Sequence, residues 1–206
     1  MWWSNVIIYC FRKKIEIEIS LFLCYFISGD NMKIMFISDI HGLTTNLELI
    51  DTRFKELHCD TLVVLGDLYL SGEMADYDPK AVREFLTSYK DKMICMKGNC
   101  DTNIDIEVSP FQMIDGYYKL QTINHDLYLT HGHVYNEKTW DKTNSILIFG
   151  HYHVPFIEKI ETNYYINPGS ISKPHNNYEA SYMIYDEEKF TIYDIHNNIL
   201  FEEKIN

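Results

Sequence analysis

The chain has 206 residues, 46% of them hydrophobic, and a formal net charge of -12. This length supports one well-buried core and is too short for two. The negative charge argues against DNA or RNA binding as the main task, because phosphate backbones need a basic face, while small anionic substrates stay open if metals supply positive charge. The five cysteines show no C-x-x-C spacing, so they indicate neither a disulfide framework nor a zinc ribbon and favour a reducing cytoplasm.

Residues 1–31 form an apolar and aromatic extension that matches no targeting pattern. Its apolar stretch, residues 19–28, is shorter than the ~20 residues of a membrane span. The basic cluster at residues 12–14 is followed by two glutamates, and no signal-peptide cleavage site follows. We expect translation to begin at Met32, with residues 1–31 an upstream misassignment or a disordered tail. The rival interpretation is a weak membrane-surface anchor.

From residue 32 onward the chain repeats one pattern, in which a buried strand ends in polar side chains. Residues 34–38 predict the first strand, which ends in Asp39-Ile40-His41, and residues 61–65 predict the second, which ends in Gly66-Asp67. A helix between two such strands favours a right-handed unit with parallel strands. Because parallel strands end at the same edge of a sheet, we expect Asp39, His41 and Asp67 to lie together.

Two helices and a third strand complete this half. Thr45 and Glu48 have the spacing of a capping box for the first helix, and Asp78 followed by Pro79 predicts the start of the second. The expected buried stripes are Leu47, Ile50, Phe54 and Leu57 in the first helix and Val82, Phe85, Leu86 and Tyr89 in the second. Residues 69–77 are expected to form a loop. Residues 92–96 predict the third strand, and Gly98-Asn99-Cys100-Asp101 follows it directly.

After Asp101 the pattern changes to short strands. Residues 118–123 and 126–130 alternate polar and apolar side chains, which predicts a hairpin ending at His131-Gly132-His133. Residues 146–149 are an apolar run that ends in Gly150-His151-Tyr152-His153. A hairpin over residues 155–166, a turn at residues 167–170 and strands near residues 181–185, 190–195 and 199–203 follow. An α/β first half and a β-rich second half predict two packed sheets flanked by helices.

The polar loops carry D-x-H, GD, GN, HGH and GHxH in that order. This order and its spacings resemble the calcineurin-like metallophosphoesterase superfamily, and the resemblance covers residues 32–206. The segments 98–101, 129–133 and 167–170 resemble more narrowly its YfcE branch of small bacterial phosphodiesterases, which is related to the retromer subunit Vps29. The resemblance implies an α/β fold of two mostly mixed sheets in a four-layer αββα sandwich.

Hydrolysis of a phosphate ester needs a nucleophile and cations that absorb phosphoryl charge. Two divalent ions ~3.5–4 Å apart supply both, because they acidify a shared water. The resemblance implies that Asp67 bridges the ions, with Asp39, His41 and His153 on the first ion and Asn99, His131 and His151 on the second. The candidate catalytic residues are Asp67, Asn99, His131 and His133. Mixed oxygen and imidazole ligands suit Mn²⁺, Fe²⁺ or Zn²⁺, and the resemblance favours Mn²⁺.

Two departures from the wider superfamily bear on the substrate. Cys100 stands where many members have a histidine that protonates the leaving group, and a neutral thiol is a poor general acid. We therefore expect a preference for diesters with good leaving groups, although Cys100 could equally be a small space-filler. His133 is a candidate second acid or phosphate contact, with structural packing as the alternative. No motif contains an arginine, which argues against a phosphoprotein phosphatase.

The sequence therefore predicts a cytoplasmic dinuclear phosphodiesterase in which a metal-bridging hydroxide attacks a small phosphodiester. The alternative is a Vps29-like non-catalytic scaffold that retains the fold. The filled ligand positions favour the enzyme, because buried polar side chains are costly without partners. No nucleic-acid or membrane partner is expected, and a homo-oligomer stays open. For Asp101 three roles remain: to cap the following loop, to orient His131 or His151, or neither.

Overall fold

The computed structural model describes residues 32–70 and 74–205. Its strands form two sheets, a six-stranded one in the order β11-β10-β9-β1-β2-β3 and a five-stranded one in the order β4-β5-β6-β8-β7. The expectations for residues 1–31 concern a part of the chain outside the described residues. Within the described ranges, no helix is both long enough and apolar enough to cross a membrane.

The first sheet is mixed. Its parallel strands are β1 (Ile34–Ile37), β2 (Thr61–Val64) and β3 (Met93–Cys95). Its antiparallel strands are β9 (Ser181–Asp186), β10 (Lys189–Asp194) and β11 (Ile199–Lys204). The two halves join where β1 pairs with β9. The expected parallel unit therefore forms one half of this sheet, and the C-terminal antiparallel strands form the other half.

The second sheet is also mixed, which confirms the predicted two-sheet architecture. Its strands are β4 (Tyr117–Gln121), β5 (Asp126–Thr130), β6 (Ile146–Phe149), β7 (Pro155–Ile160) and β8 (Asn163–Pro168). Strands β5, β6 and β8 run parallel, and β4 and β7 are antiparallel edge strands. β8 extends further than the sequence predicted, so Asn167 and Pro168 belong to the strand rather than to the turn.

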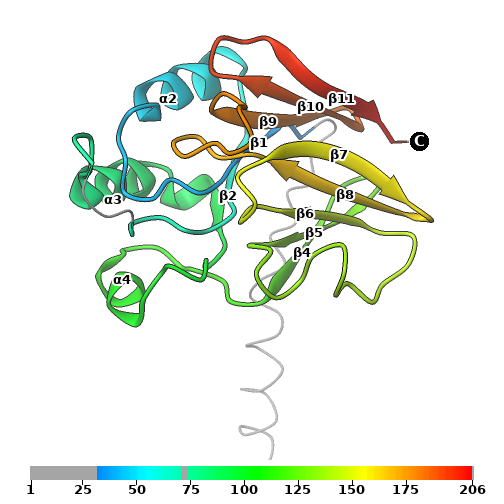
Figure 1. The fold of residues 1–206 in the computed structure, drawn as a ribbon, viewed down its shortest axis with the longest axis horizontal. Helices are drawn as coiled ribbons and strands as arrows, with labels where there is room; N and C mark the ends of the chain where they lie inside the picture. The colour runs from blue at the N-terminus through cyan, green and yellow to red at the C-terminus, as the bar shows by residue number, and fades with distance from the viewer. Residues whose placement is uncertain (1–31, 71–73, 206) are drawn as a thin grey trace, which may run out of the picture. The chain divides into compact units, whose positions relative to one another are not determined.

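Two clusters of buried apolar side chains pack against the two faces of the first sheet. Ile34 and Phe36 of β1 pack between the sheets, while Met35 and Ile37 pack toward the helices. All four side chains are fully buried, because successive strand residues point to opposite faces and both faces of this sheet are covered. Figure 1 shows α2 (Leu47–Glu56) and α3 (Pro79–Ser88) beside β1 and β2, on the side away from β5 and β6.

The two helix starts differ in how well the sequence predicted them. Asp78 caps α3 as expected, since its side chain accepts a hydrogen bond from the Ala81 N–H at 3.0 Å. The predicted capping box of α2 is wrong: Asn46 is the N-cap residue and its side chain makes no capping bond. The Thr45 hydroxyl instead donates to Asp76 Oδ2 at 2.8 Å, so a loop contact replaces the cap.

The sequence analysis missed a third helix, α4 (Asn103–Val108), which follows the 3₁₀ turn η1 (Lys90–Lys92) and β3. It has no buried residue and therefore shows no apolar periodicity. A local signal was present, because Thr102 and Asp105 form a capping box, with the Thr102 N–H donating to Asp105 Oδ2 at 2.7 Å.

The outer face of the second sheet is covered by residues 131–145, which contain no helix. Trp140 from this segment packs on Leu147, Phe149 and Tyr165, and its indole N–H donates to the Ser145 hydroxyl at 2.8 Å. The fold therefore has few flanking helices, and an aromatic loop forms the fourth layer of the expected sandwich.

The loops that follow β2 and β3 approach each other closely at the site, and this gives a test of the fold. A Cβ on Gly98 would collide with the backbone nitrogen and Oδ1 of Asp67. We expect Gly98→Ala to lower the free energy of unfolding by about 1–3 kcal/mol in urea titrations and to displace Asp67, so that Mn²⁺ binding is lost. Gly116→Ala is the control for Mn²⁺ binding only: its Cβ would meet nothing within 4 Å, but its φ of 78° makes an alanine there strained, so its stability also falls. Unchanged Mn²⁺ affinity in Gly98→Ala would contradict this packing.

Candidate metal centre

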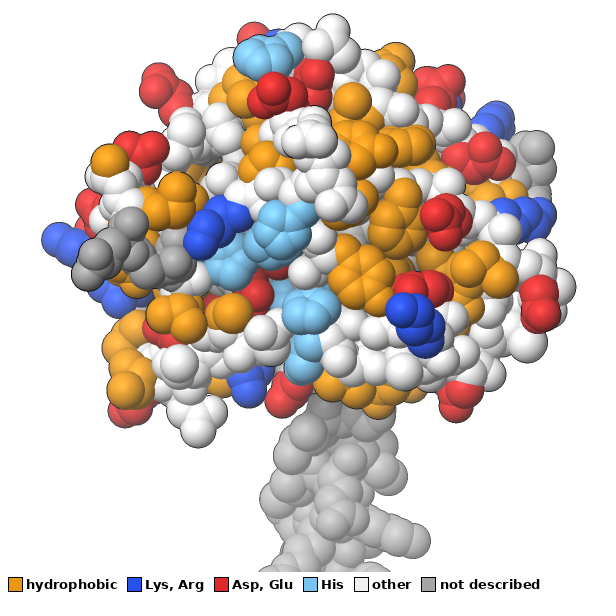
Figure 2. All heavy atoms as spheres, in the orientation of Figure 1, with side chains coloured by type: hydrophobic (Ala, Val, Ile, Leu, Met, Phe, Trp, Pro, Cys, Tyr) orange, Lys and Arg blue, Asp and Glu red, His pale blue; other side chains and the backbone are white. Residues whose placement is uncertain are grey.

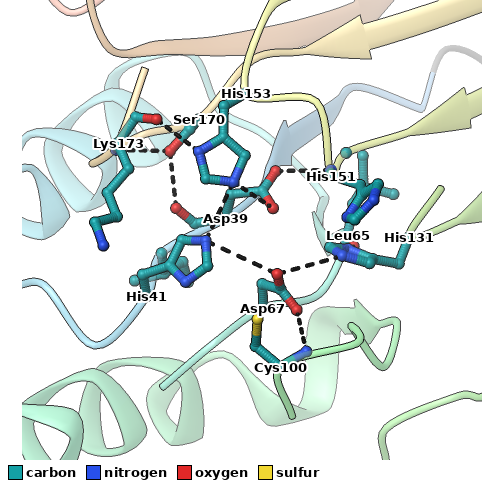
Figure 3. Close-up of polar contacts among 12 residues, drawn as sticks. Asp39, His41, Leu65, Asp67, Cys100, His131, His151, His153, Ser170 and Lys173 are labelled. Atoms are coloured by element: carbon teal, nitrogen blue, oxygen red, sulfur yellow. Dashed lines mark hydrogen bonds and ion pairs between the residues drawn. The ribbon is translucent and has the colours of Figure 1, made fainter. Parts of the chain in front are cut away.

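The seven candidate ligands lie in loops that follow parallel strands of both sheets. Asp39 and His41 follow β1, Asp67 follows β2, Asn99 follows β3, His131 follows β5, and His151 and His153 follow β6. The structure brings donor atoms of Asp39, His41 and His153 within 4.8 Å of one another, and does the same for Asp67, His131 and His151. Figure 3 shows these side chains pointing toward a common centre. The two sheets therefore place their loop side chains at one edge, as the strand pattern predicted.

The first group consists of Asp39, His41 and His153. The Nδ1 atoms of His41 and His153 each lie 2.6 Å from a backbone carbonyl, of Leu70 and Lys173 respectively. A carbonyl only accepts, so Nδ1 carries the proton and the neutral ring has a bare Nε2. The two Nε2 atoms nevertheless lie 3.2 Å apart, and His153 Nε2 lies 3.3 Å from Asp39 Oδ1. When both rings are neutral, their two Nε2 lone pairs and the Asp39 carboxylate therefore face one another.

The second group repeats this arrangement around His131. Its Nδ1 donates to the Leu65 carbonyl at 2.7 Å, which again leaves Nε2 bare. Asn99 Oδ1 lies 2.9 Å and Asp67 Oδ2 lies 3.4 Å from that Nε2. Asp67 Oδ2 also lies 3.8 Å from His41 Nε2, so this carboxylate stands between the two groups.

The two groups differ in how far their side chains are exposed to solvent. All three members of the first group are buried. In the second group Asp67 and His131 are buried as well, but His151 is half-buried and Asn99 is exposed. Figure 2 shows histidine side chains gathered in the middle of one face, with acidic atoms visible between them. The centre therefore reaches solvent on the side of the second group.

The backbone at the site is strained. Five of the seven candidate ligands have positive φ angles: Asp39, His41, Asp67, His151 and His153, at 53° to 67°. This left-handed region costs a non-glycine residue about 1–3 kcal/mol, and residues held in it cluster at functional sites as well as in turns. The strain turns each side chain out of its strand and into the centre.

Asp101 fixes the backbone of the loop that carries Asp67. Its carboxylate accepts backbone N–H groups of Gly98 at 2.8 Å, Asp67 at 3.0 Å and Leu68 at 2.7 Å. Burial raises the pKa of this carboxyl, and the backbone donors oppose that rise. Of the three possibilities left open by the sequence, the structure matches the last, neither a cap of the following loop nor a histidine partner: Asp101 positions the backbone around Asp67.

The loop after β8 positions Asp39 in the same manner. The hydroxyls of Ser170 and Ser172 donate to the Asp39 carbonyl at 2.8 and 3.0 Å. The Asn167 side chain donates to the Gly150 carbonyl at 2.6 Å, while the His151 N–H donates to Asp39 Oδ2 at 3.0 Å. The sequence analysis treated residues 167–170 only as a turn, and their composition gave no sign of these long-range contacts.

Cys100 lies beside Asp67. Its N–H donates to Asp67 Oδ1 at 2.8 Å, and its thiol, His41 and Asp67 form a further group of donors within 4.8 Å. Burial, together with the charge of Asp67, raises the pKa of the Cys100 thiol to about 12, so the sulfur is a neutral thiol. For Asp67 burial acts to raise the pKa of its carboxyl, but the contacts with His131 and Cys100 together outweigh burial and lower it.

Two further histidines border the centre. His133 is exposed, with its ring centroid 5.4 Å from that of His131 and 6.3 Å from that of His151. Burial and the nearby His131 lower the pKa of His133. His175, to which the sequence analysis gave no role, stacks on His153 with centroids 4.5 Å apart. No motif signalled His175, because it belongs to an irregular loop.

The arrangement fits divalent cations. Asp39 Oδ1 is buried and has no hydrogen-bond partner among the described residues, although its charge makes such burial expensive. Cations would satisfy this oxygen and remove the repulsion among the facing Nε2 atoms. Oxygen and imidazole donors of this kind suit first-row transition metals.

The fold and the site define a member of the metallophosphoesterases. Residues 32–189 match the family model of the calcineurin-like phosphoesterase superfamily domain, and the chain belongs to this family. It is 32% identical over 167 residues to phosphodiesterase YfcE of Escherichia coli strain K12, covering 78% of this chain and 91% of that protein.

Solved structures agree with this assignment. The structure of YfcE, described as a phosphoesterase from E. coli, superposes with a TM-score of 0.80 at 31% identity, covering 85% of this chain and all of that one. Wild-type Vps29 from Entamoeba histolytica, solved in complex with Zn²⁺, superposes with a TM-score of 0.56 at 21% identity, covering 84% and 98% of the two chains. The Vps29 likeness concerns the fold alone.

His153 gives a direct test of the ligand assignment. We expect His153→Ala to reduce the Mn²⁺ stoichiometry from two ions per chain to one, measured by calorimetric titration of the metal-free protein, because the first group loses a donor. His196→Ala, an exposed histidine in the β10–β11 turn, is the matched control and should bind Mn²⁺ as the wild type does. Two ions bound with wild-type affinity in His153→Ala would refute the assignment.

The pH dependence of metal binding gives a second test. Burial lowers the pKa values of His131 and His153, but their carboxylate neighbours outweigh burial and raise both. Both imidazoles therefore become protonated at a higher pH than a free histidine, and protons compete with the metal. Mn²⁺ affinity should be full at high pH and fall as pH decreases, by about one to two log units per pH unit below pH 7. Calorimetry at pH 6, 7 and 8 measures this; a constant affinity contradicts it.

Proposed function

We propose that this metallophosphoesterase hydrolyses a small phosphodiester with the aid of two divalent cations, Mn²⁺ being the preferred ion. The observation that carries the proposal is the convergence of histidine Nε2 atoms and carboxylate oxygens in two adjacent groups. Bound cations would acidify a water molecule and neutralise phosphoryl charge. The similarity to YfcE, a protein named as a phosphodiesterase, supports the diester class.

The proposed ligand roles follow the two groups. Asp67 bridges the ions, because its Oδ2 lies between His41 and His131. The first ion is held by Asp39, His41, Asp67 and His153, and the second by Asp67, Asn99, His131 and His151. The neutral Cys100 thiol is a weaker ligand than a thiolate, so it does not shift the preference toward zinc.

The surroundings of the second group decide which ester bond breaks easily. A thiol with a pKa of about 12 donates a proton poorly at neutral pH. His133 lies at the rim, and the lowered pKa of its imidazole keeps it neutral, with one N–H available for a phosphoryl oxygen. We therefore propose His133 as a phosphate contact and expect good leaving groups to be cleaved fastest.

The alternative is a scaffold without catalysis. A Vps29 structure contains Zn²⁺, so a bound metal alone does not separate an enzyme from a scaffold. The left-handed backbone at five candidate ligands directs their side chains for metal binding, which both alternatives allow. Turnover is therefore the required measurement.

We also propose that the metallophosphoesterase domain spans residues 32–206, beyond the family match that ends at 189, because β11 pairs with β10 along its length. A cytoplasmic location is a further proposal. It is supported by the three cysteines of the described residues, Cys59, Cys95 and Cys100, which are free thiols.

The assay compares a bis-aryl phosphodiester with the corresponding aryl monoester in the presence of Mn²⁺. We expect faster cleavage of the diester, and no cleavage by Asp67→Asn. Cys100→His should raise monoesterase kcat by about tenfold or more, because it places an imidazole where the leaving group departs. Cys100→Ala is the control and should leave monoester cleavage slow.

Two results would count against this proposal. Absence of diester hydrolysis with Mn²⁺, Fe²⁺ or Zn²⁺ favours the scaffold. Faster cleavage of the monoester by the wild type contradicts the role given to Cys100.

A further inference from the structure

His175 stands at the edge of the candidate metal centre, and the proposed ligand set does not use it. Its N–H donates to the His153 carbonyl at 2.9 Å, so its backbone follows the ligand loop. Its ring lies nearly parallel to that of His153, with an interplanar angle of 18° and centroids 4.5 Å apart. His175 is nevertheless exposed, whereas His153 is 8% exposed. An aromatic ring is thus presented to solvent directly above a buried candidate ligand.

The loop that carries His175 is fixed to the site at several points. The Ser170 hydroxyl holds the Asp39 carbonyl, and the Ser172 hydroxyl donates to the Ile40 carbonyl at 2.6 Å. The Lys173 carbonyl accepts the Nδ1 proton of His153 at 2.6 Å. A rigidly held loop loses little entropy when a ligand binds, so the ring is preorganised.

A purely supporting role accounts poorly for this placement. The orientation of the His153 ring is already set by its hydrogen bond to Lys173. A supporting ring contributes most when it is buried, because packing energy scales with the area removed from water. The exposed His175 ring instead leaves aromatic surface open to solvent beside His153, on the side of the first group.

We propose that His175 is a specificity-determining residue, whose ring is the platform for a planar aromatic group of the diester, such as a nucleobase. Histidine is among the side chains on which bases stack. The inference rests on the proposed function, because it places the phosphoryl group at the metal centre. The preferred substrate class is therefore a nucleotide-type or aryl diester rather than a diester of glycerol or a sugar.

Lys173 supplies a charge that acts on any such substrate. Figure 3 shows its side chain extending along the same side of the centre as His41. An ammonium group there attracts phosphate irrespective of what is attached to it. Lys173 would thus contribute charge and His175 would contribute stacking, and variants of the two residues can distinguish these contributions.

The experiment uses a ligand pair that differs only in the base, AMP and ribose 5-phosphate, titrated calorimetrically into Mn²⁺-loaded protein. We expect the wild type to bind AMP about tenfold more tightly, within the range that stacking of one base contributes. His175→Phe should keep this ratio, because it retains an aromatic ring. His175→Ala should bring the ratio close to one, with the loss confined to AMP. Lys173→Ala should weaken both ligands alike and keep the ratio.

Several outcomes would overturn the inference. AMP binding no tighter than ribose 5-phosphate in the wild type does so, and so does an absence of measurable binding for both. Equal weakening of both ligands in His175→Ala, together with lower Mn²⁺ affinity, would show that His175 only supports His153. Diester turnover is measured in parallel: if turnover is present and the ligand ratio is one, this inference fails while the proposed function stands.

Discussion

The hydrogen bonds from histidine Nδ1 atoms to backbone carbonyls are the constraint on which the site depends. The carbonyls of Leu70, Lys173 and Leu65 fix the tautomers of His41, His153 and His131 in turn. Each bond turns a lone pair inward, and the inward lone pairs repel one another until a cation lies between them. The carbonyls come from loops far apart in sequence, so the correct chemistry exists only in the complete fold.

The fold offsets the instability of this arrangement through backbone contacts rather than through the ligands themselves. Asp101 accepts three N–H groups around the Asp67 loop, and two serine hydroxyls hold the carbonyl of Asp39. These bonds over-determine left-handed conformations that isolated Asp and His residues would avoid. The conformation of this centre is therefore stabilised by side chains other than the candidate ligands.

The fold and the convergence of the seven loop side chains could be predicted because a pattern of residue types in the sequence signals both. Apolar runs mark buried strands, and polar residues at their ends mark the edge. The sequence did not predict Ser170 or His175 as neighbours of the site, and it left the role of Asp101 open, since their partners lie elsewhere in the chain and no periodicity connects them. It misplaced the cap of α2 for the same reason: Thr45 bonds to Asp76 across a loop. The loading of the site with ions stays a prediction.

The rim of the centre has two chemically different sides. Cys100, Asn99 and His133 lie beside the second group, where solvent enters and neither Cys100 nor His133 is a strong acid at neutral pH. Lys173 and His175 lie beside the buried first group, on a loop tied to Asp39. A diester has two substituents, and under the two proposals these sides would treat them differently: one would leave without protonation at the second group, while the other would stack on His175. The asymmetry of the rim is what connects the proposed reaction with the proposed specificity.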